Sequence, residues 1–345
     1  MKKKKSLLLF TFFSFLLFFT PFSCEEAEEI NASAYPYEEL VYPSGEACGI
    51  KILSDGILVI SVTDIDEAPS PAKKAGIIPG DFVKGINGNP LKDSDDFIKK
   101  VKELKDKEFE IEFEREGQRK SAKLKPYLKE GEFVLGMWVR DSIAGLGTLT
   151  FYSGDKKSFS ALGHSISDTD TGEVMPVKDG ELVYANISSI RKGEKGSPGG
   201  LVGYFTEESK VIGNITDNTL FGLSGKISNP QIIQKTTPVP LGRKDDIRLG
   251  KAKIITTIEK EPELFNIEII KINKQNKPDV KGLVIKVTDK RLLEKTGGIV
   301  QGMSGSPIIQ DGKLVGAVTH VFVNDPTRGY GIFIENMLAE TEKIK

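Results

Sequence analysis

The sequence predicts a mainly β protein in which a mixed α+β segment, residues 48–127, precedes a segment of short strands, residues 128–345. Short apolar runs recur between glycine turns in the second segment, and the chain contains 35 glycines. This pattern is typical of an all-β sandwich or barrel. The first segment combines strand-like runs with one amphipathic helical run, which indicates a smaller α+β domain.

Composition and charge exclude several classes of function. The 345 residues leave room for two or three domains of about 100–200 residues each. Net charge is −1, and without Lys2 to Lys5 it is 44 basic against 49 acidic residues, or −5, so no basic surplus remains for nucleic acid. Two histidines and two cysteines, far apart in the chain, offer no metal-ligand cluster, and no phosphate loop is present. We therefore expect neither a metal nor a cofactor.

The N-terminus has the features of an export signal. Lys2 to Lys5 precede the uncharged run Ser6–Phe22, which predicts a signal peptide or a membrane anchor over residues 1–24. Cys24 ends the run and leaves lipidation open as an alternative. Residues 25–47 are acidic and contain proline, so we expect a linker there. The lysines stay inside, and the rest of the chain is expected outside the cytoplasm.

Residues 48–127 contain signals for strands, a turn and a helix. Strands are predicted at Ile57–Val62, Asp81–Ile86 and Phe109–Phe113, with a hairpin turn at Asn87-Gly88. A helix is predicted over Ser94–Leu104, because the residues at its start can cap it and its apolar positions share one face.

The stretch from Ser70 to Gly88, SPAKKAGIIPGDFVKGING, resembles the central motif of PDZ domains. The resemblance implies β-augmentation, in which an extended peptide pairs with an open strand edge beside a helix. The strand would be Ile57, Leu58, Val59 and Ile60, the helix Ser94–Leu104, and the occupant a peptide ligand or the chain's own segment. A structural domain without a ligand is the alternative.

The strongest chemical signal is the run Gly302-Met303-Ser304-Gly305-Ser306-Pro307, which an apolar strand follows. A nucleophilic serine needs such a turn, because glycine allows the backbone to bend and its amides to point at the carbonyl under attack. We expect the backbone amides of Gly302 and Ser304 to form an oxyanion hole, where loss of one donor costs about 2.7–4 kcal/mol.

The same run resembles the nucleophile turn of chymotrypsin-like peptidases, and the match continues through Gly316 to Thr319. The resemblance implies a double β-barrel after the PDZ-like segment. Met303 stands where that family commonly has an Asp, which pairs with a new N-terminus during activation, so that mechanism is in doubt here. Ser306 replaces a glycine. A second glycine-flanked serine, Ser197, is followed by proline, which fits a plain turn.

A serine nucleophile needs a base, and the chain offers only His164 and His320. His164 lies among small residues after a strand and precedes Ser304 by 140 positions, as the order His then Ser requires. We assign it as the base. His320 lies 16 residues after Ser304, on the strand that the resemblance places beside the substrate, and we expect no catalytic duty for it.

The third member must be a carboxylate that orients the imidazole. Asp217 lies 53 residues after His164 and 87 before Ser304, close to the chymotrypsin spacing of about 45 and 93. Asp289 lies only 15 residues before Ser304 and could instead cap the helix predicted after it.

Nearly the full chain resembles the sporulation stage IV B peptidase family, on the PDZ-like segment, ALGHS at 161–165, KGEKGSPG at 192–199, VTD at 287–289, GMSGSP at 302–307 and THVFVNDPT at 319–327. The resemblance implies Ser304, His164 and Asp289 as catalytic residues, with Asp217 kept second.

The same resemblance implies an exported serine endopeptidase in the space between mother cell and forespore of a spore-forming bacterium. Its implied substrate is a membrane-bound regulator of an intramembrane protease that matures a late sigma factor. Self-cleavage is implied too, with linker 25–47 as the accessible site. The alternatives are a secreted PDZ adaptor with an inactive protease scaffold and a general quality-control PDZ-protease.

Overall fold

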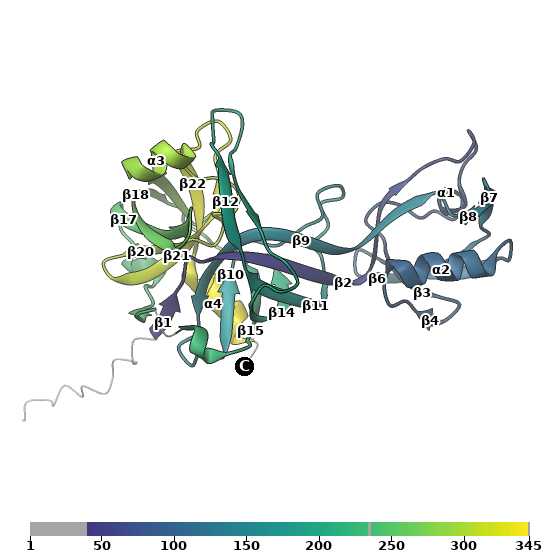
Figure 1. Ribbon diagram of the computed structural model, residues 1–345, viewed down its shortest axis with the longest axis horizontal. Helices are drawn as coiled ribbons and strands as arrows, with labels where there is room; N and C mark the ends of the chain where they lie inside the picture. Colours follow the sequence, from purple (N-terminus) through teal and green to yellow (C-terminus); the bar gives the residue numbers. More distant parts are fainter. Residues whose placement is uncertain (1–39, 234–235, 344–345) are drawn as a thin grey trace, which may run out of the picture. The chain divides into compact units, whose positions relative to one another are not determined.

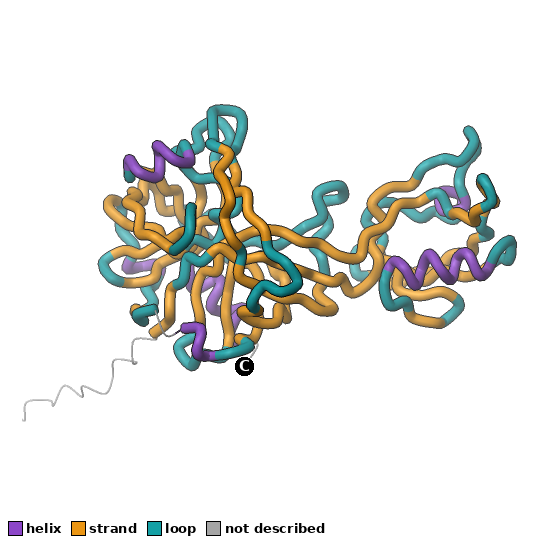
Figure 2. The backbone as a smooth tube through the Cα atoms, viewed as in Figure 1, coloured by secondary structure: helices purple, strands orange, loops and turns teal. Residues whose placement is uncertain are grey.

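The computed structural model describes residues 40–233 and 236–343, and Figures 1 and 2 show a chain built mainly of strands. The predictions for residues 1–24, for Cys24 and for most of the linker lie outside the described residues. No helix in the described part is long and apolar enough to cross a membrane.

The mixed segment forms an α+β domain around its own core. Helix α2 spans Ser94–Leu104 as predicted, capped by Asp93, whose carboxylate accepts from Asp96 N at 2.8 Å. Phe97 and Val101 turn from α2 into the core. The other elements of this domain are α1 (Pro71–Lys74), β3 (Phe82–Ile86), β4 (Asn89–Pro90), β5 (Phe109–Arg115), β6 (Gln118–Leu124), β7 (Tyr127–Lys129) and β8 (Glu132–Val134).

A first barrel forms because β2 pairs with β9 and so closes a ring of neighbouring strands. In order around the ring these are β2 (Ala47–Val62), β9 (Met137–Tyr152), β10 (Ser158–Ala161), β15 (Gly222–Ile227), β14 (Val211–Thr219) and β11 (Val177–Tyr184). A hairpin, β12 (Asn186–Arg191) and β13 (Gly200–Tyr204), extends from the barrel between β11 and β14. The short strands β1 (Leu40–Pro43) and β16 (Val239–Pro240) continue the sheet beside β9.

A second, closed barrel is built from β17 (Gly250–Thr257), β18 (Pro262–Ile272), β19 (Leu283–Val287), β22 (Arg328–Phe333), β21 (Lys313–Val321) and β20 (Pro307–Gln310). Helix α3 (Lys290–Thr296) follows β19 and ends at Gly297, which has φ +76°, the left-handed conformation that favours glycine. Helix α4 (Ile334–Glu342) closes the chain, and its Met337 packs in a shared core with Val41 and Phe151 of the first barrel. The predicted mainly β fold, an α+β domain with a double barrel, is confirmed.

Strand β2 runs from the first barrel into the α+β domain. Residues 47–53 of β2 pair with β9 and those from 48 to 54 pair with β11, so this stretch belongs to the first barrel, and the α+β core begins at Ile57. Residues 40–43, predicted as linker, form strand β1. Strand β9 returns from the α+β domain to the barrel beside β2, as Figure 1 shows. The α+β domain is therefore inserted between two neighbouring barrel strands.

Candidate active site

The turn that carries Ser304 consists of two successive tight turns. Met303 N donates to Val300 O at 3.1 Å, and Ser306 N donates to Met303 O at 3.0 Å. The third residue of each turn is a glycine with positive φ, +95° at Gly302 and +98° at Gly305, as type II turns require. Ser306 Oγ adds a second bond to Met303 O at 2.7 Å. The motif therefore holds Ser304 at the second position of a turn, where its side chain faces outward.

The amides predicted for the oxyanion hole are left without a partner. Among the described residues, neither Gly302 N nor Ser304 N donates a hydrogen bond to another protein group, whereas the amides of Met303 and Gly305 both do. Unpaired donors on either side of a serine are the arrangement that stabilises a developing oxyanion. Their assignment as an oxyanion hole stays a prediction that this geometry permits.

Met303 is fully buried in the core of the second barrel. A thioether cannot form the ion pair with a new N-terminus that an Asp makes at this position in the resembled peptidases. The turn of this chain must therefore be held by other contacts.

His164 follows β10 through a bend in which Leu162 and Gly163 both have positive φ, +70° and +74°. Its Nδ1 lies 2.8 Å from Ser165 O, and a carbonyl can only accept, so Nδ1 carries the proton and Nε2 keeps its lone pair. Burial lowers the pKa of His164 below its usual value, which keeps the ring neutral near pH 7. This is the tautomer and the charge state that a general base needs.

Ser304 and His164 contact two adjacent residues of β21. Ser304 Oγ donates to Thr319 O at 2.7 Å, and the His164 ring lies 5.0 Å, centroid to centroid, from that of His320. The chain around them is packed closely: a Cβ on Gly305 would lie 2.7 Å from Leu162 N. No hydrogen bond joins Ser304 to His164 in the described structure, so the hydroxyl must leave Thr319 to reach its base.

Residues 131–338 match the family model of the SpoIVB peptidase S55, and residues 46–125 match that of the PDZ domain. The chain belongs to the SpoIVB peptidase S55 family. It is a serine peptidase, a hydrolase, with a PDZ domain. The S55 match spans both barrels apart from the β2 strand, and it includes both Ser304 and His164.

Solved structures of a PDZ domain and of proteases are similar to this S55 peptidase at low sequence identity. The PDZ domain of the SdrC-like protein from Listeria monocytogenes is 28% identical, with 25% of this chain and 90% of that one covered and a TM-score of 0.23. The inactive form of the Rv3671c protease of M. tuberculosis is 13% identical (58% and 84% covered, TM-score 0.32). The HtrA-type protease AlgW with decapeptide is 13% identical (62% and 54%, TM-score 0.35). A search of curated proteins found no match.

Asp289 accepts no hydrogen bond from His164 in the described structure of this S55 peptidase. Its carboxylate caps α3 by accepting from Arg291 N at 3.0 Å, and the Arg291 guanidinium and Asn266 N also bind it. Arg291 lowers the pKa of Asp289, so the group is ionised. Asp217, the second candidate, accepts from Thr216 Oγ1 at 2.8 Å. The third catalytic member stays a prediction, and for Asp289 it requires the carboxylate to exchange Arg291 for His164.

The strand predicted to bind a peptide is not an open edge. Leu58 pairs with Phe82 of β3 on one side and with Arg140 of β9 on the other, and Val59 pairs with Val139. Strand β9 also contacts helix α2, because Asp141 Oδ2 accepts from Ser94 N at 2.7 Å. Of the two predicted occupants, the chain's own segment lies beside residues 57–60 in this structure. The reason is the long β2–β9 pairing that connects the PDZ domain to the barrel.

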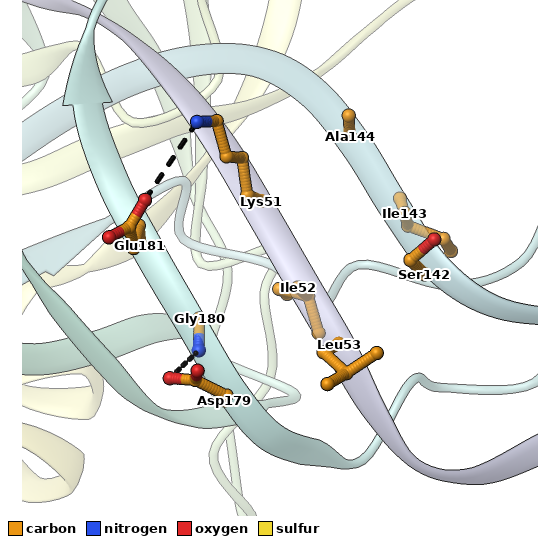
Figure 3. Close-up of a pocket in the computed structure, with 9 residues that line it drawn as sticks. All are labelled: Lys51, Ile52, Leu53, Ser142, Ile143, Ala144, Asp179, Gly180 and Glu181. Atoms are coloured by element: carbon orange, nitrogen blue, oxygen red, sulfur yellow. Dashed lines mark hydrogen bonds and ion pairs between the residues drawn. The ribbon is translucent and has the colours of Figure 1, made fainter. Parts of the chain in front are cut away.

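Ser197 lies in a tight turn that the Glu194–Ser197 bridge closes, which is the plain turn predicted from the sequence. Figure 3 shows the residues of β2, β9 and β11 that line a hollow, among them Lys51 and Glu181, which form an ion pair at 3.8 Å. The hollow has a volume of about 360 Å³. None of its lining residues belongs to the site of Ser304 and His164. We therefore assign this hollow no role in catalysis by Ser304.

Two residues that form hydrogen bonds with the Ser304 turn were not predicted from the sequence. Thr148 of β9 and Leu201 of β13 both donate hydrogen bonds to carbonyl groups of this turn. A threonine or a leucine inside an apolar strand has no sequence signal that separates it from ordinary core residues.

Proposed function

We propose that this S55 peptidase is an exported endopeptidase in which Ser304 attacks the peptide carbonyl and His164 takes and returns the proton. The observation that carries the proposal is the convergence of the Ser304 hydroxyl and the His164 ring on Thr319 and His320. The free amides of Gly302 and Ser304 would receive the negative charge on the carbonyl oxygen. Asp289 would orient the imidazolium once it is freed from Arg291.

The catalytic cycle follows from the tautomer of His164. Nε2 accepts the Ser304 proton as the hydroxyl oxygen bonds to the carbonyl carbon, and the resulting imidazolium is held at Nδ1. The same proton then passes to the leaving amine as the peptide bond breaks. Water repeats the two steps and releases the acid, which restores the hydroxyl and the neutral ring.

The family supports a role for the peptidase in sporulation signalling. The proposed substrate is a membrane-bound regulator of an intramembrane protease that matures a late sigma factor, cleaved in the space between mother cell and forespore. We also propose self-cleavage in the N-terminal linker. Because residues 40–43 form strand β1, the cut is expected before residue 40.

A fluorophosphonate probe tests the chemistry directly, because it labels only an activated serine. The wild-type chain should be labelled, Ser304→Ala should not, and His164→Ala should be labelled at least 100-fold more slowly. Ser197→Ala is the matched control, since Ser197 is also flanked by glycine, and it should label like wild type. Labelling that survives Ser304→Ala, or an unlabelled but folded wild type, would refute the proposal.

The substrate class needs a separate test. The purified chain should cut the exported domain of a membrane-bound regulator of an intramembrane protease at one bond, and Ser304→Ala should leave that domain intact. Mass spectrometry of both chains after incubation would also show new N-termini before residue 40 in wild type alone. An active peptidase that leaves the regulator uncut would overturn the assigned substrate while sparing the mechanism.

A further inference from the structure

Three carbonyl groups around the predicted oxyanion hole accept hydrogen bonds from residues of the first barrel. Leu201 N donates to Gln301 O at 2.8 Å. Thr148 donates twice: its Oγ1 to Gly302 O at 2.7 Å and its N to Ser304 O at 3.0 Å. The turn belongs to the second barrel, so its conformation is held from across the interface.

These bonds fix the direction of the amides that face the oxyanion. In a trans peptide the C=O and the following N–H point to opposite sides, so the carbonyl of Gln301 sets the direction of Gly302 N–H. A positive φ at Gly302 belongs to a type II turn, and rotation of this central peptide would give type I and reverse the N–H. The bond from Leu201 N favours the orientation in which Gly302 N stays unpaired.

Thr148 connects the turn to the loop of the base. The residue is 1% exposed, and its own carbonyl accepts from Leu162 N at 3.3 Å, two residues before His164. The Thr148 hydroxyl is too deeply buried to form a hydrogen bond with water. Its bond to Gly302 O is the only hydrogen bond described for this hydroxyl.

Leu201 is anchored in a different way. Its side chain is 9% exposed and packs in the core of the second barrel, while its neighbour Val202 is 48% exposed on the other face of the strand. The hairpin is also fixed at Gly199, whose carbonyl accepts from Gln301 N at 3.0 Å. The glycine-rich run 192–199, which contributed to the family resemblance without an assigned role, therefore ends at a residue that is hydrogen-bonded to the turn.

We propose that Thr148 and Leu201 are positioning residues that hold the oxyanion hole of this peptidase in its active form. They replace the ion pair that Met303 cannot make. The inference rests on the proposed function of Ser304, His164 and the two amides, and it adds that the first barrel sets the geometry of the hole through one strand and one hairpin.

The test for Thr148 compares two variants in the full chain, with kcat and KM measured on a p-nitrophenyl ester. Thr148→Val keeps the size and the backbone N–H but removes the hydroxyl, so kcat should fall roughly 3- to 10-fold at unchanged KM. Thr148→Ser keeps the hydroxyl and should stay within about twofold of wild type. A purely structural role would lower thermal stability without this split between kcat and KM or its rescue by serine.

The test for Leu201 uses its neighbour as control. Leu201→Ala should loosen the hairpin and lower both kcat and the fluorophosphonate labelling rate by about tenfold. Val202→Ala, in the same strand with its side chain in solvent, should leave both rates unchanged. A boronic acid inhibitor, whose tetrahedral adduct needs the hole, should weaken in Thr148→Val and Leu201→Ala by the same factors.

The outcomes separate this inference from the function on which it rests. If Ser304→Ala abolishes turnover but Thr148→Val and Leu201→Ala keep the wild-type kcat, the positioning role is wrong and the mechanism stands. If Thr148→Val fails to fold, Leu201→Ala against Val202→Ala decides the question. If the ester is hydrolysed equally by Ser304→Ala, both the function and the inference fail.

Discussion

Ser304 Oγ donates its hydrogen bond to Thr319 O, 2.7 Å away, and not to the imidazole of His164. The nucleophile is therefore in a resting orientation in which its proton is held by a backbone carbonyl of β21. A substrate segment that pairs with this strand would supply its own N–H to the carbonyl of Thr319. The Ser304 hydroxyl would then be free to form a hydrogen bond with His164. Binding of the substrate would therefore also activate the nucleophile.

Activity is expected to depend on pH through His164. Burial lowers the pKa of this residue below about 6.5, and only the neutral ring can act as base. The labelling rate should therefore be on its plateau at pH 7 and fall only below pH 6.5. Labelling between pH 4 and pH 9 measures the midpoint, and a midpoint above 6.5 would contradict the burial argument.

The free energy of unfolding should also decrease at low pH, because of both histidines. Partial burial, and after it the neighbouring His164, lower the pKa of His320 to about 4, and the pKa of His164 is also depressed. Between the folded and unfolded pKa values the unfolded chain binds more protons, so stability falls as pH drops from 6.5 towards 4. Urea unfolding at pH 7 and pH 5 would show this. The His320→Gln variant should lose less stability over that interval than wild type.

The third catalytic residue can be assigned by paired substitutions. If Asp289 orients His164, Asp289→Asn should lower kcat by about 10⁴-fold, as loss of the orienting acid does in related triads. Asp217→Asn should then change kcat less than twofold. Arg291→Gln supplies a further check, because it frees the carboxylate of Asp289 and should not lower activity. The reverse pattern, with Asp217→Asn inactive, would give the role to Asp217.

The close contact of the two barrels at Gly305 predicts a large effect of one methyl group. A Cβ at Gly305 would lie 2.0 Å from Thr148 O, whereas at Gly312 it would have nothing within 4 Å. Both glycines have positive φ, so each Gly→Ala change carries about 1–2 kcal/mol of backbone strain. Gly312→Ala should show only that loss in urea unfolding and full activity. Gly305→Ala should lose more stability and most of its activity, and equal effects would argue against the contact.

The insertion of the PDZ domain predicts which fragments fold. A chain of residues 128–345 lacks Cys48, Ile50 and Ile52 of β2, all buried in the first barrel. At about 1.5–3 kcal/mol for each buried side chain, the loss approaches the whole stability of a typical domain, about 5–15 kcal/mol. We expect no cooperative thermal transition for 128–345 and a sharp one for 40–345. A folded, probe-reactive 128–345 fragment would show that β2 is dispensable.

Local signals predicted the elements of this chain well. Ser94–Leu104 is a helix over the residues expected, and β3 (Phe82–Ile86) lies within the predicted strand Asp81–Ile86, because capping residues and apolar runs act over a few positions. The nucleophile turn was predicted for a similar reason. The glycines that give Gly302 and Gly305 their positive φ are visible in the sequence itself.

Long-range pairing explains what the sequence did not indicate. Ala47 lies opposite Thr148, about a hundred positions away, and no local signal in either segment shows that the first residues of β2 pair with β9. The strand at 57–60 was predicted to have an open edge, but β9, which begins at Met137, pairs with it. The hydrogen-bond partner of Asp289 could not be predicted either, since a carboxylate before a helix can cap that helix or accept a hydrogen bond from a histidine.

The PDZ domain leaves the barrel and re-enters it through strands that are hydrogen-bonded to each other, with Leu53 opposite Ser142. Its two ends are thus neighbours, and a hairpin turn of a few residues could join them in its place. Insertion, deletion or exchange of the whole domain at this point would therefore leave the strand pairing of the barrels unchanged. Diversity of control among such enzymes could then arise by recombination at this one junction.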